Sequence, residues 1–541
     1  MPTFDATPIV YWALAYLLAG GVLWGSLEKR VPTVAYLLAA LVLFGMMRLP
    51  AVVFNRELNP DESQMISHAL TLYQDPVYWR SVDGTTIGPL DNYLLVLPRL
   101  LGFELNYTSA RVMGLLCSAG ALLFFFGAVR QWFGVATARV ALLPPLFFLS
   151  FTQEADFVHY SSEQLPLLLL GGCLGLLAWL SRQSTPSLVV ALGLGLLAGM
   201  VPFAKLQAVP QAVVLVLGGL WITYQHYRHQ GTWRPTLALL AGGIAFPLLV
   251  LGWTLYHGVF QDLIDFYIKG NSIYAGSNGL LDVPTQLVSL LATSPDFSAY
   301  AAMLLLPVLV GTWGWWRSLS SRRESFVPLL LLVYLLASVY AATKSGNSFG
   351  HYLNLCIYPW ALAAACGWWR LASYKVPLVG TLVLPLVWFG AQDAASFHQS
   401  RRLNAFVSEG ATTLPTDMVS EKIKTYTRPG DYLVVWGWQC RYYVETQLAQ
   451  GTAENHSERS IFEHPMREVY RTRYLSDLKR TQPAVFLDAV GKNSIWVSDR
   501  ATQGHESFPA LAKYLTANYL LADTLDDTRL YVRKDRYFSK P

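Results

Sequence analysis

The chain has 541 residues and a net charge of only +5, with 53% hydrophobic and 14% charged residues. A soluble protein of this length carries roughly a quarter charged residues, so the composition excludes an ordinary soluble protein. The small net charge, with basic residues mostly between apolar runs, gives no sign of a nucleic-acid partner.

Apolar runs recur along the first three quarters of the chain. Each is about 18–22 residues long and lacks charge, which is the length that spans a hydrocarbon core. The pattern predicts a multi-spanning α-helical membrane protein with about twelve transmembrane helices. Their centres are expected near Leu17, Leu43, Ala119, Leu146, Leu170, Leu194, Val216, Gly243, Pro307, Leu335, Ala363 and Leu384.

The loops between these runs alternate in charge. Short loops rich in Lys and Arg alternate with loops rich in acids, which cover 57–104, 154–163 and 262–296. Because basic loops stay in the cytoplasm, the acidic loops should lie outside. The N-terminus and the whole C-terminal region are then extracytoplasmic as well.

The composition becomes that of a soluble protein from about Ala395. We therefore predict a transmembrane domain over 1–394 and a small extracytoplasmic α/β domain over 395–541. Helices are expected over 401–427, 464–480 and 508–519, strands over 431–436 and 484–487, and a final hairpin turning at Asp526-Asp527. No glycine-rich phosphate-binding motif is present, so no nucleotide site is indicated.

Two adjacent carboxylates, Asp61 and Glu62, follow the second apolar run in the segment ELNPDES. Acids at the mouth of a membrane helix avoid the bilayer centre, and one of them could act as a general base on an incoming hydroxyl. The alternative is structural, since Asn59-Pro60-Asp61 is also a helix-start signal with acids in the first turn.

A second acidic group lies in the next outer loop, where Glu154 and Asp156 are followed by His159 and Glu163. These residues share the membrane face of Asp61, although a solvated acidic loop would show the same composition. Carboxylate pairs can hold Mg²⁺ or Mn²⁺, so Asp61 and Asp156 are possible metal ligands. Lysines beside a phosphate could replace such a metal.

Isolated cations form a third group on the outer face, where cations are scarce. They are Lys205, Lys269 and Lys344, the last followed by His351 and Tyr352 in TKSGNSFGHYLN. An ammonium at a helix end suits a lipid-linked phosphate, and His351 beside Lys344 strengthens that interpretation. The alternative is that each lysine only reaches toward lipid headgroups.

Together these features resemble a known family. The Asp-Glu pair after an early helix, the ExD triplet in the second outer loop and the run HYLNLCIYPW resemble GT-C membrane glycosyltransferases. The nearest groups are the protein O-mannosyltransferases and the aminoarabinose transferase-like proteins. The stretch RPGDYLVVWGWQCRYYVETQ resembles the extracytoplasmic C-terminal domain of many bacterial members.

The resemblance implies a polyprenyl-phosphate sugar donor and inverting transfer outside the cytoplasmic membrane of a bacterium. The acceptor would be a glycan, a lipid or a protein. Asp61 would be the base or would orient the acceptor, with Glu62 supporting it. Glu154 and Asp156 would match the family's modified DxD motif. The donor phosphate would be held by Lys205, Lys269, Lys344, His351 and Tyr352. A departure from the family's basic-Pro-Pro segment, which is 86–90 here, leaves acceptor recognition open.

Two other classes of protein stay open. A transporter or lipid flippase would place ionisable groups near the bilayer midplane, often in repeated halves, whereas these acids gather at the outer surface and no repeat is visible. A non-catalytic scaffold would tolerate the loss of Asp61. The expected partners are the lipid-linked donor, its acceptor and membrane lipids.

Overall fold

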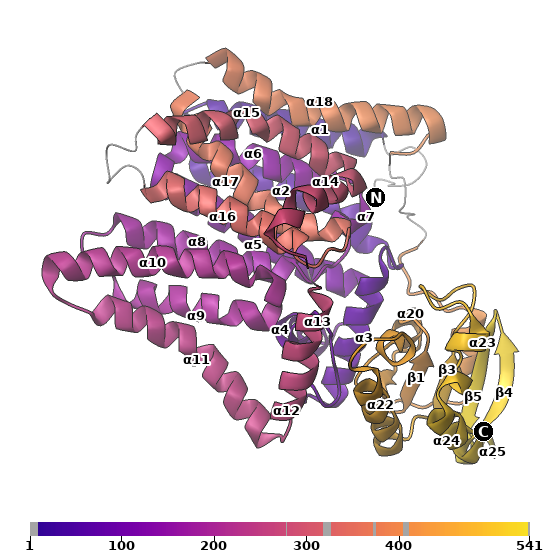
Figure 1. Cartoon of the computed structure of the whole chain (residues 1–541). Coiled ribbons are helices and arrows are strands. Elements are labelled where there is room, and N and C mark those ends of the chain that lie inside the picture. Colours follow the sequence, from indigo (N-terminus) through magenta and orange to yellow (C-terminus); the bar gives the residue numbers. More distant parts are fainter. Residues whose placement is uncertain (1–8, 277, 318–325, 372–374, 404–410, 539–541) are drawn as a thin grey trace. The chain divides into compact units, whose positions relative to one another are not determined.

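The computed structural model describes residues 9–276, 278–317, 326–371, 375–403 and 411–538. The chain separates into two compact units. The first contains 1–54, 114–253 and 273–410, and the second contains 55–113, 254–272 and 411–541. Figure 1 shows the elements of both units, coloured along the chain.

The first unit is built from long helices, and two of them, α5 and α11, continue into the second unit. They are α1 (Ile9–Leu27), α2 (Thr33–Val53), α5 (Tyr107–Phe133), α6 (Val135–Phe151), α8 (Gln164–Arg182), α9 (Leu188–Ala204), α10 (Val209–Gln230), α11 (Arg234–Tyr256), α15 (Pro295–Arg317), α16 (Phe326–Thr343), α17 (Asn354–Leu371) and α18 (Lys375–Ser400).

Each of the twelve predicted centres lies inside one of these helices. In the described part of the chain, eight helices are long and apolar enough to cross a membrane, and three further apolar helices are shorter. The prediction of a multi-pass helical membrane protein is therefore confirmed. The number of twelve crossings stays a prediction.

Small residues let two of the long helices approach closely. A side chain at Gly195 of α9 would meet the carbonyl oxygen of Leu239 on α11, and one at Gly199 would meet the backbone of Gly243. Helices in a membrane gain no hydrophobic driving force from each other, so close backbone contact through small residues stabilises their association. Figure 1 shows these two helices beside each other.

Short helices connect the long ones at several points. The first unit contains α7 (Ala155–Val158), η1 (Leu206–Ala208), η3 (Leu280–Asp282), α14 (Val283–Thr293) and η4 (Gly350–Leu353). The second contains α3 (Pro60–Gln74), α4 (Pro89–Leu100), α12 (Phe260–Asp262) and η2 (Leu263–Lys269), while α13 (Gly270–Tyr274) joins the two sets.

The second unit also contains a five-stranded sheet in the order β2-β1-β3-β5-β4. Its strands are β1 (Tyr432–Trp436), β2 (Ala449–Gln450), β3 (Val485–Asp488), β4 (Tyr519–Leu525) and β5 (Thr528–Arg533). The first three are parallel, and β5 pairs antiparallel with β3 and β4. The predicted strands and hairpin are confirmed, and the turn residues Asp526 and Asp527 have φ of 44° and 63°, as a tight primed turn requires.

Helices cover both faces of this sheet. They are α19 (Met418–Lys424), α20 (Arg441–Thr446), α21 (Glu458–Ile461), α22 (Arg467–Thr481), α23 (Arg500–Gln503), α24 (Pro509–Asn518) and α25 (Lys534–Phe538). The predictions over 464–480 and 508–519 are confirmed by α22 and α24. The helix predicted over 401–427 lies partly outside the described residues, and within 411–427 only α19 is helical.

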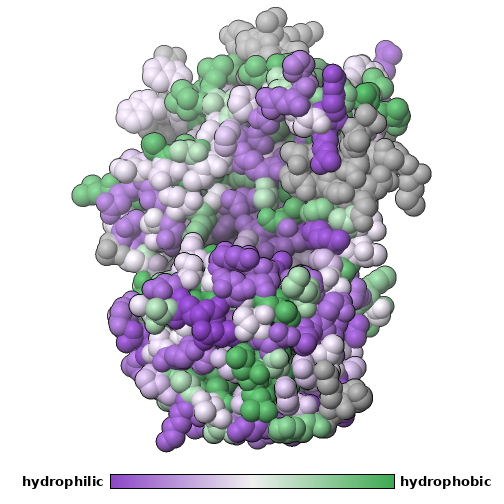
Figure 2. All heavy atoms as spheres, turned by 90° about the vertical axis from the view of Figure 1, so that its right-hand side faces the viewer, coloured by the Kyte–Doolittle hydropathy of each residue, from purple (hydrophilic) through white to green (hydrophobic). Residues whose placement is uncertain are grey.

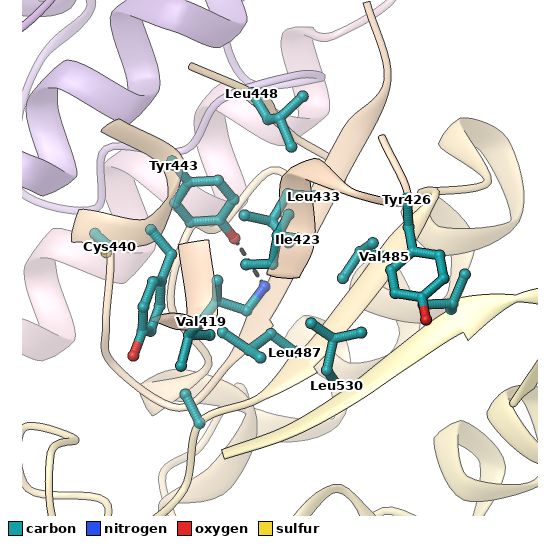
Figure 3. Close-up of a cluster of buried hydrophobic side chains, with 14 residues drawn as sticks. Val419, Ile423, Tyr426, Leu433, Cys440, Tyr443, Leu448, Val485, Leu487 and Leu530 are labelled. Carbon is teal, nitrogen blue, oxygen red and sulfur yellow. Dashed lines mark hydrogen bonds between the residues drawn. The ribbon is translucent and has the colours of Figure 1, made fainter. Parts of the chain in front are cut away.

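One core of the sheet lies between the strands and α19. Figure 3 shows Val419 and Ile423 of that helix among Leu433, Val485 and Leu487 of the strands. In this core the Val435 N–H donates to the Tyr443 hydroxyl over 2.9 Å, which joins α20 to β1. The face in the lower half of Figure 2 combines hydrophilic residues with patches of hydrophobic ones.

The segment 55–113 and the C-terminal segment fold together in the second unit. The backbone N–H of Asn55 donates to the Ala411 carbonyl over 2.7 Å, and that of Gln450 donates to the Thr71 hydroxyl over 3.0 Å. Residues 55–113 therefore belong to the same compact unit as 411–541, and the predicted domain boundary at 395 stays a prediction.

Candidate active site

Asp61 lies in the first turn of α3, which begins at Pro60. The side chain of Asn59 accepts a hydrogen bond from the Asp61 N–H over 3.0 Å and so caps the helix. The helix-start interpretation of this segment is correct, with Asn59 as the capping residue and the two acids in the first turn.

Glu62 is fully buried and bound by Arg111 at the start of α5. The guanidinium donates to both carboxylate oxygens, from Nε to Oε1 over 2.7 Å and from Nη2 to Oε2 over 2.5 Å. The same carboxylate also accepts the N–H of Leu58 over 3.1 Å. Such a two-bond pair has a rigid geometry, so Glu62 fixes the direction in which α3 leaves the loop.

In the first unit, Glu154 closes the junction between α14 and α15. Its carboxylate accepts the Asp296 N–H over 2.9 Å and the Ser294 hydroxyl. Burial raises the pKa of Glu154, and these hydrogen bonds only partly offset the effect. Asp296 in turn accepts the Thr152 hydroxyl over 2.7 Å, so two carboxylates lie in one hydrogen-bonded network.

Asp156 lies on α7 beside the short helix η4. Its carboxylate is 3.9 Å from Nδ1 of His351, which forms an ion pair when the imidazole is protonated. The side chain of Asn354 donates to the Asp156 carbonyl over 3.2 Å and holds α7 against η4. The Asp156 side chain is 33% exposed, so it remains accessible to a ligand.

Lys205, at the end of α9, forms a buried ion pair with Glu163 at the start of α8. Its ammonium also donates to the Ser162 hydroxyl over 2.7 Å and lies 5.4 Å from the ring centre of Tyr352. Burial disfavours the ionised form of Glu163, but the neighbouring Lys205 outweighs it and lowers the pKa of this carboxyl.

The other two lysines differ in their partners. Lys344 donates to the backbone carbonyl of Asn278 over 2.6 Å and forms no ion pair within the described residues. Lys269 pairs with Asp265 one turn earlier on η2, with 58% of its side chain exposed. Of the three lysines, Lys344 therefore has a charge that no described carboxylate balances.

The structure brings several predicted residues together within the first unit. Tyr352 links the group, because its ring contacts both Lys205 and His351 and its hydroxyl bonds that of Tyr274 over 2.7 Å. His159 also approaches His351, at 6.2 Å between ring centres. Asp61, Glu62 and Lys269 belong to the second unit instead.

Sequence reasoning missed three participants. Arg111 holds Glu62, Asp296 bonds Glu154, and Asp393 of α18 accepts hydrogen bonds from the Trp12 indole over 2.9 Å and from the Tyr16 hydroxyl over 2.6 Å. The only indication in the sequence is that each is a charged residue at the end of an apolar run. A charge in that position is costly and needs a partner.

A possible metal-binding group in the described residues lies in the C-terminal sheet. Asp488, His505 and Glu506 have ligand atoms within 4.8 Å of one another. Two arginines already approach these carboxylates, since Arg529 donates to Glu506 over 2.5 Å and Arg500 lies 3.6 Å from Asp488. None of the predicted site residues belongs to this group.

Comparison with known proteins shows a similarity of fold. No family profile matches the chain, and no curated protein is detectably similar in sequence. The crystal structure of ArnT from Cupriavidus metallidurans bound to undecaprenyl phosphate is similar, with a TM-score of 0.57 and 13% identity over 92% of this chain and 98% of that one. Its apo state gives a TM-score of 0.52 and 13% identity over 96% and 97%.

The chain therefore shares the fold of these two ArnT structures, as the resemblance in the sequence predicted. Because the alignment covers nearly all of both chains, the similarity includes the helical region and the C-terminal sheet.

Proposed function

We propose that this protein is a membrane glycosyltransferase that moves a sugar from a polyprenyl-phosphate donor to an acceptor hydroxyl with inversion. The observation that carries the proposal is the group of polar residues at the helix ends of the first unit. In this group Asp156 lies beside His351, and Lys205 forms an ion pair with Glu163. Tyr352 contacts both His351 and Lys205. The fold shared with an ArnT that binds undecaprenyl phosphate supports the same class of donor.

In the proposed reaction, Asp61 accepts the proton of the acceptor hydroxyl. The freed oxygen forms a bond to the anomeric carbon on the face opposite the phosphate. The bond between that carbon and the phosphate oxygen breaks, and its electron pair leaves with the polyprenyl phosphate. Inversion follows from this single displacement. A phosphate leaves readily, so one base and a stabilised leaving group suffice.

Lys344 is the main ligand that we assign to the donor phosphate. An ammonium has three donors, and the Asn278 carbonyl uses one of them. His351 can add a second positive charge when protonated, and Tyr352 can add a hydroxyl. Lys205 lies beside this group, but its pairing with Glu163 balances its charge and makes it primarily a residue that positions Tyr352.

The roles of the remaining candidates follow from their contacts. Glu62 positions α3 through Arg111, and Glu154 with Asp156 shapes the loop that carries the modified DxD motif. Lys269 is an exposed, paired lysine that can attract an anionic lipid headgroup. Asp61 and Asp156 could each contribute an oxygen to a Mg²⁺ or Mn²⁺ ion, but no step proposed above passes through a metal.

The proposed location is the outer face of a bacterial cytoplasmic membrane, with the N-terminus and residues 395–541 outside. The charge alternation of the loops supports this orientation. The sugar could be a hexose or a pentose, and the acceptor a glycan, a lipid or a protein. A donor that enters from the bilayer also agrees with the lack of a nucleotide-binding motif in the sequence.

The competing function is movement of the lipid-linked sugar across the bilayer without chemistry. A transporter or flippase leaves the bond between sugar and phosphate intact, whereas a transferase breaks it. This difference can be measured directly on the donor.

The test is incubation of the purified full-length protein with a panel of polyprenyl-phosphate sugars, followed by phosphorus NMR for free polyprenyl phosphate. Wild type should release polyprenyl phosphate from one donor, slowly with water as acceptor and faster with the true acceptor. Saturable binding of a donor without any cleavage would favour the flippase. Absence of both binding and cleavage across the panel, in folded protein, would contradict the proposal.

A further inference from the structure

Three loops of the C-terminal sheet meet at one edge. Strands β2, β1 and β3 are parallel neighbours, so their carboxyl ends lie on the same side. The loop after β2 carries His456, the loop after β1 carries Trp438, and the loop after β3 carries Trp496. In open α/β sheets, ligands bind outside the carboxyl ends of the strands.

The rings of these three residues are in contact, and one of the three side chains is exposed. Trp438 lies flat against His456, with ring centres 4.2 Å apart and planes inclined by 6°. Trp496 meets Trp438 edge to face at 5.2 Å and 83°. His456 is buried, whereas Trp496 is 57% exposed. We call Trp438, Trp496 and His456 the aromatic shelf.

Backbone hydrogen bonds fasten the three loops to one another. The Trp438 N–H donates to the Ser494 hydroxyl over 2.8 Å, and the Ile495 N–H donates to the Trp438 carbonyl over 3.3 Å. The Gly437 N–H donates to the Ser457 hydroxyl over 2.6 Å. The shelf is therefore preorganised by bonds between loops.

Two features of the shelf are costly unless a ligand uses it. Trp496 has φ of 57°, a left-handed conformation that costs a residue with a side chain about 1–2 kcal/mol. Strain of this kind concentrates at functional sites. In addition, the Trp438 indole N–H and Nδ1 of His456 are buried and have no hydrogen-bond partner among the described residues. Both are polar groups that a ligand or a bound water could satisfy.

The shelf is bonded to the helix that carries Asp61. The Gln64 amide donates to Nε2 of His456 over 3.0 Å, and the Asn455 amide donates to the Gln64 carbonyl over 2.8 Å. Asp61 lies three residues before Gln64, which places both on one side of α3. Burial, together with the carboxylates of Glu57 and Asp61, also raises the pKa of Cys440, two residues beyond Trp438.

The charges around the shelf favour a neutral, polyhydroxylated ligand. Lys492, in the loop that carries Trp496, pairs with Asp526 over 3.0 Å, and Arg500 lies 3.8 Å from Asp527. A membrane anchor for anionic lipids would instead present unbalanced cations around its aromatic residues. A sugar ring can place its apolar C–H face on an exposed indole while its hydroxyls reach polar groups at the rim.

We propose that the aromatic shelf binds a sugar ring of the acceptor, so that the acceptor is a glycan or carries one. The inference rests on the proposed function only in naming this ligand the acceptor. Sugar binding by the shelf itself can be measured without any donor, which keeps the two proposals separate.

The experiment is saturation-transfer NMR on the full-length protein with three neutral disaccharides, cellobiose, maltose and chitobiose. Wild type should show saturable transfer to ring C–H protons of at least one of them. Trp496→Ala should weaken binding by about tenfold, while Trp496→Phe should keep most of it, since an aromatic face remains. Trp179→Ala, which removes another exposed tryptophan on α8, is the matched control and should bind as wild type does.

Three results would overturn the proposal. They are no saturable transfer from any disaccharide in wild type, equal binding by Trp496→Ala, and loss of binding to anionic vesicles by Trp496→Ala without any effect on disaccharides. Donor cleavage with water as acceptor, measured on the same proteins, should be equal in wild type and Trp496→Ala. Sugar binding without donor cleavage would contradict the proposed function but support sugar binding by the shelf. Donor cleavage without sugar binding would contradict only the proposal that the shelf binds sugar.

Discussion

Lys205 and Glu163 form a buried ion pair that joins the end of α9 to the start of α8. The two residues are 42 positions apart in sequence, and both side chains are almost completely inaccessible to solvent. The ring centre of Tyr352 lies 5.4 Å from the Lys205 ammonium of this pair. A residue expected to contact the donor is thus bound to another part of the protein.

The first prediction concerns the energetics of this pair. Lys205→Met and Glu163→Gln should each reduce the free energy of unfolding by about 3–5 kcal/mol, because each leaves a buried polar group without its partner. The double variant Lys205→Met/Glu163→Gln should be less destabilised than the sum of the two single changes. Thermal unfolding in detergent measures all of these. Additive effects would show that the two residues do not stabilise each other.

The second prediction separates Lys344 from the paired lysines. Lys344→Ala should weaken binding of the lipid-linked donor by roughly tenfold or more, as expected for loss of a charge-assisted contact to phosphate. Folding should change little, since the residue forms no ion pair in the described chain. The affinity is measured by titration with the intact donor that wild type cleaves. Lys513→Ala, which removes an exposed lysine, is the control. Unchanged affinity would remove Lys344 from the site.

The third prediction concerns the start of α3. Arg111→Lys keeps the positive charge but cannot form the same two bonds with Glu62, so it should destabilise the second unit by about 1–3 kcal/mol. If Glu62 positions α3, the rate of donor cleavage should fall as well, with little change in donor affinity. Stability and rate equal to those of wild type would show that the pair is dispensable.

The fourth prediction is a pH effect in the C-terminal part. Burial raises the pKa of Glu454 to about 8, against an ordinary 4.5, although the Arg473 guanidinium opposes the shift. The folded state therefore keeps a proton that the unfolded chain loses between these two pH values. This carboxyl makes the protein less stable as pH rises from about 4.5 to 8.

Glu454→Gln should remove that loss and raise the unfolding temperature more at pH 8 than at pH 5. Both oxygens of Glu454 lack a hydrogen-bond partner in the described chain, which is consistent with a neutral carboxyl. Glu421→Gln, an exposed glutamate on α19, is the control and should shift the unfolding temperature equally at both pH values. An equal effect of the two changes would show that Glu454 is ionised in the folded protein.

Local patterns in the sequence predicted the elements of the fold. The apolar runs predict the long helices because about 20 consecutive apolar residues are the length of a helix that spans the hydrocarbon core. The segment DYLVVW became β1 and the Asp526-Asp527 pair became a hairpin turn for equally local reasons. The boundary at 395 came from composition, which cannot show that 55–113 folds with the C-terminal segment.

The partners of the charged residues could not be predicted, because they depend on tertiary contacts. Glu62 is bound by a residue 49 positions away, and Asp393 by one 381 positions away. The sequence placed Glu154, Asp156 and His351 on one membrane face, and the structure gathers them within one unit. The sequence could not show that Lys205 forms an ion pair with a carboxylate and that Lys344 bonds a backbone carbonyl instead.

The most direct test of the account is donor cleavage by Asp61→Asn beside wild type, with the donor that wild type cleaves. The change keeps the volume of the side chain and removes the base, and Asn59 still caps α3. We predict unchanged folding and donor affinity with release of polyprenyl phosphate reduced by at least about a hundredfold, the usual contribution of a general base. Release at the wild-type rate would contradict the assignment of Asp61 and the proposed mechanism.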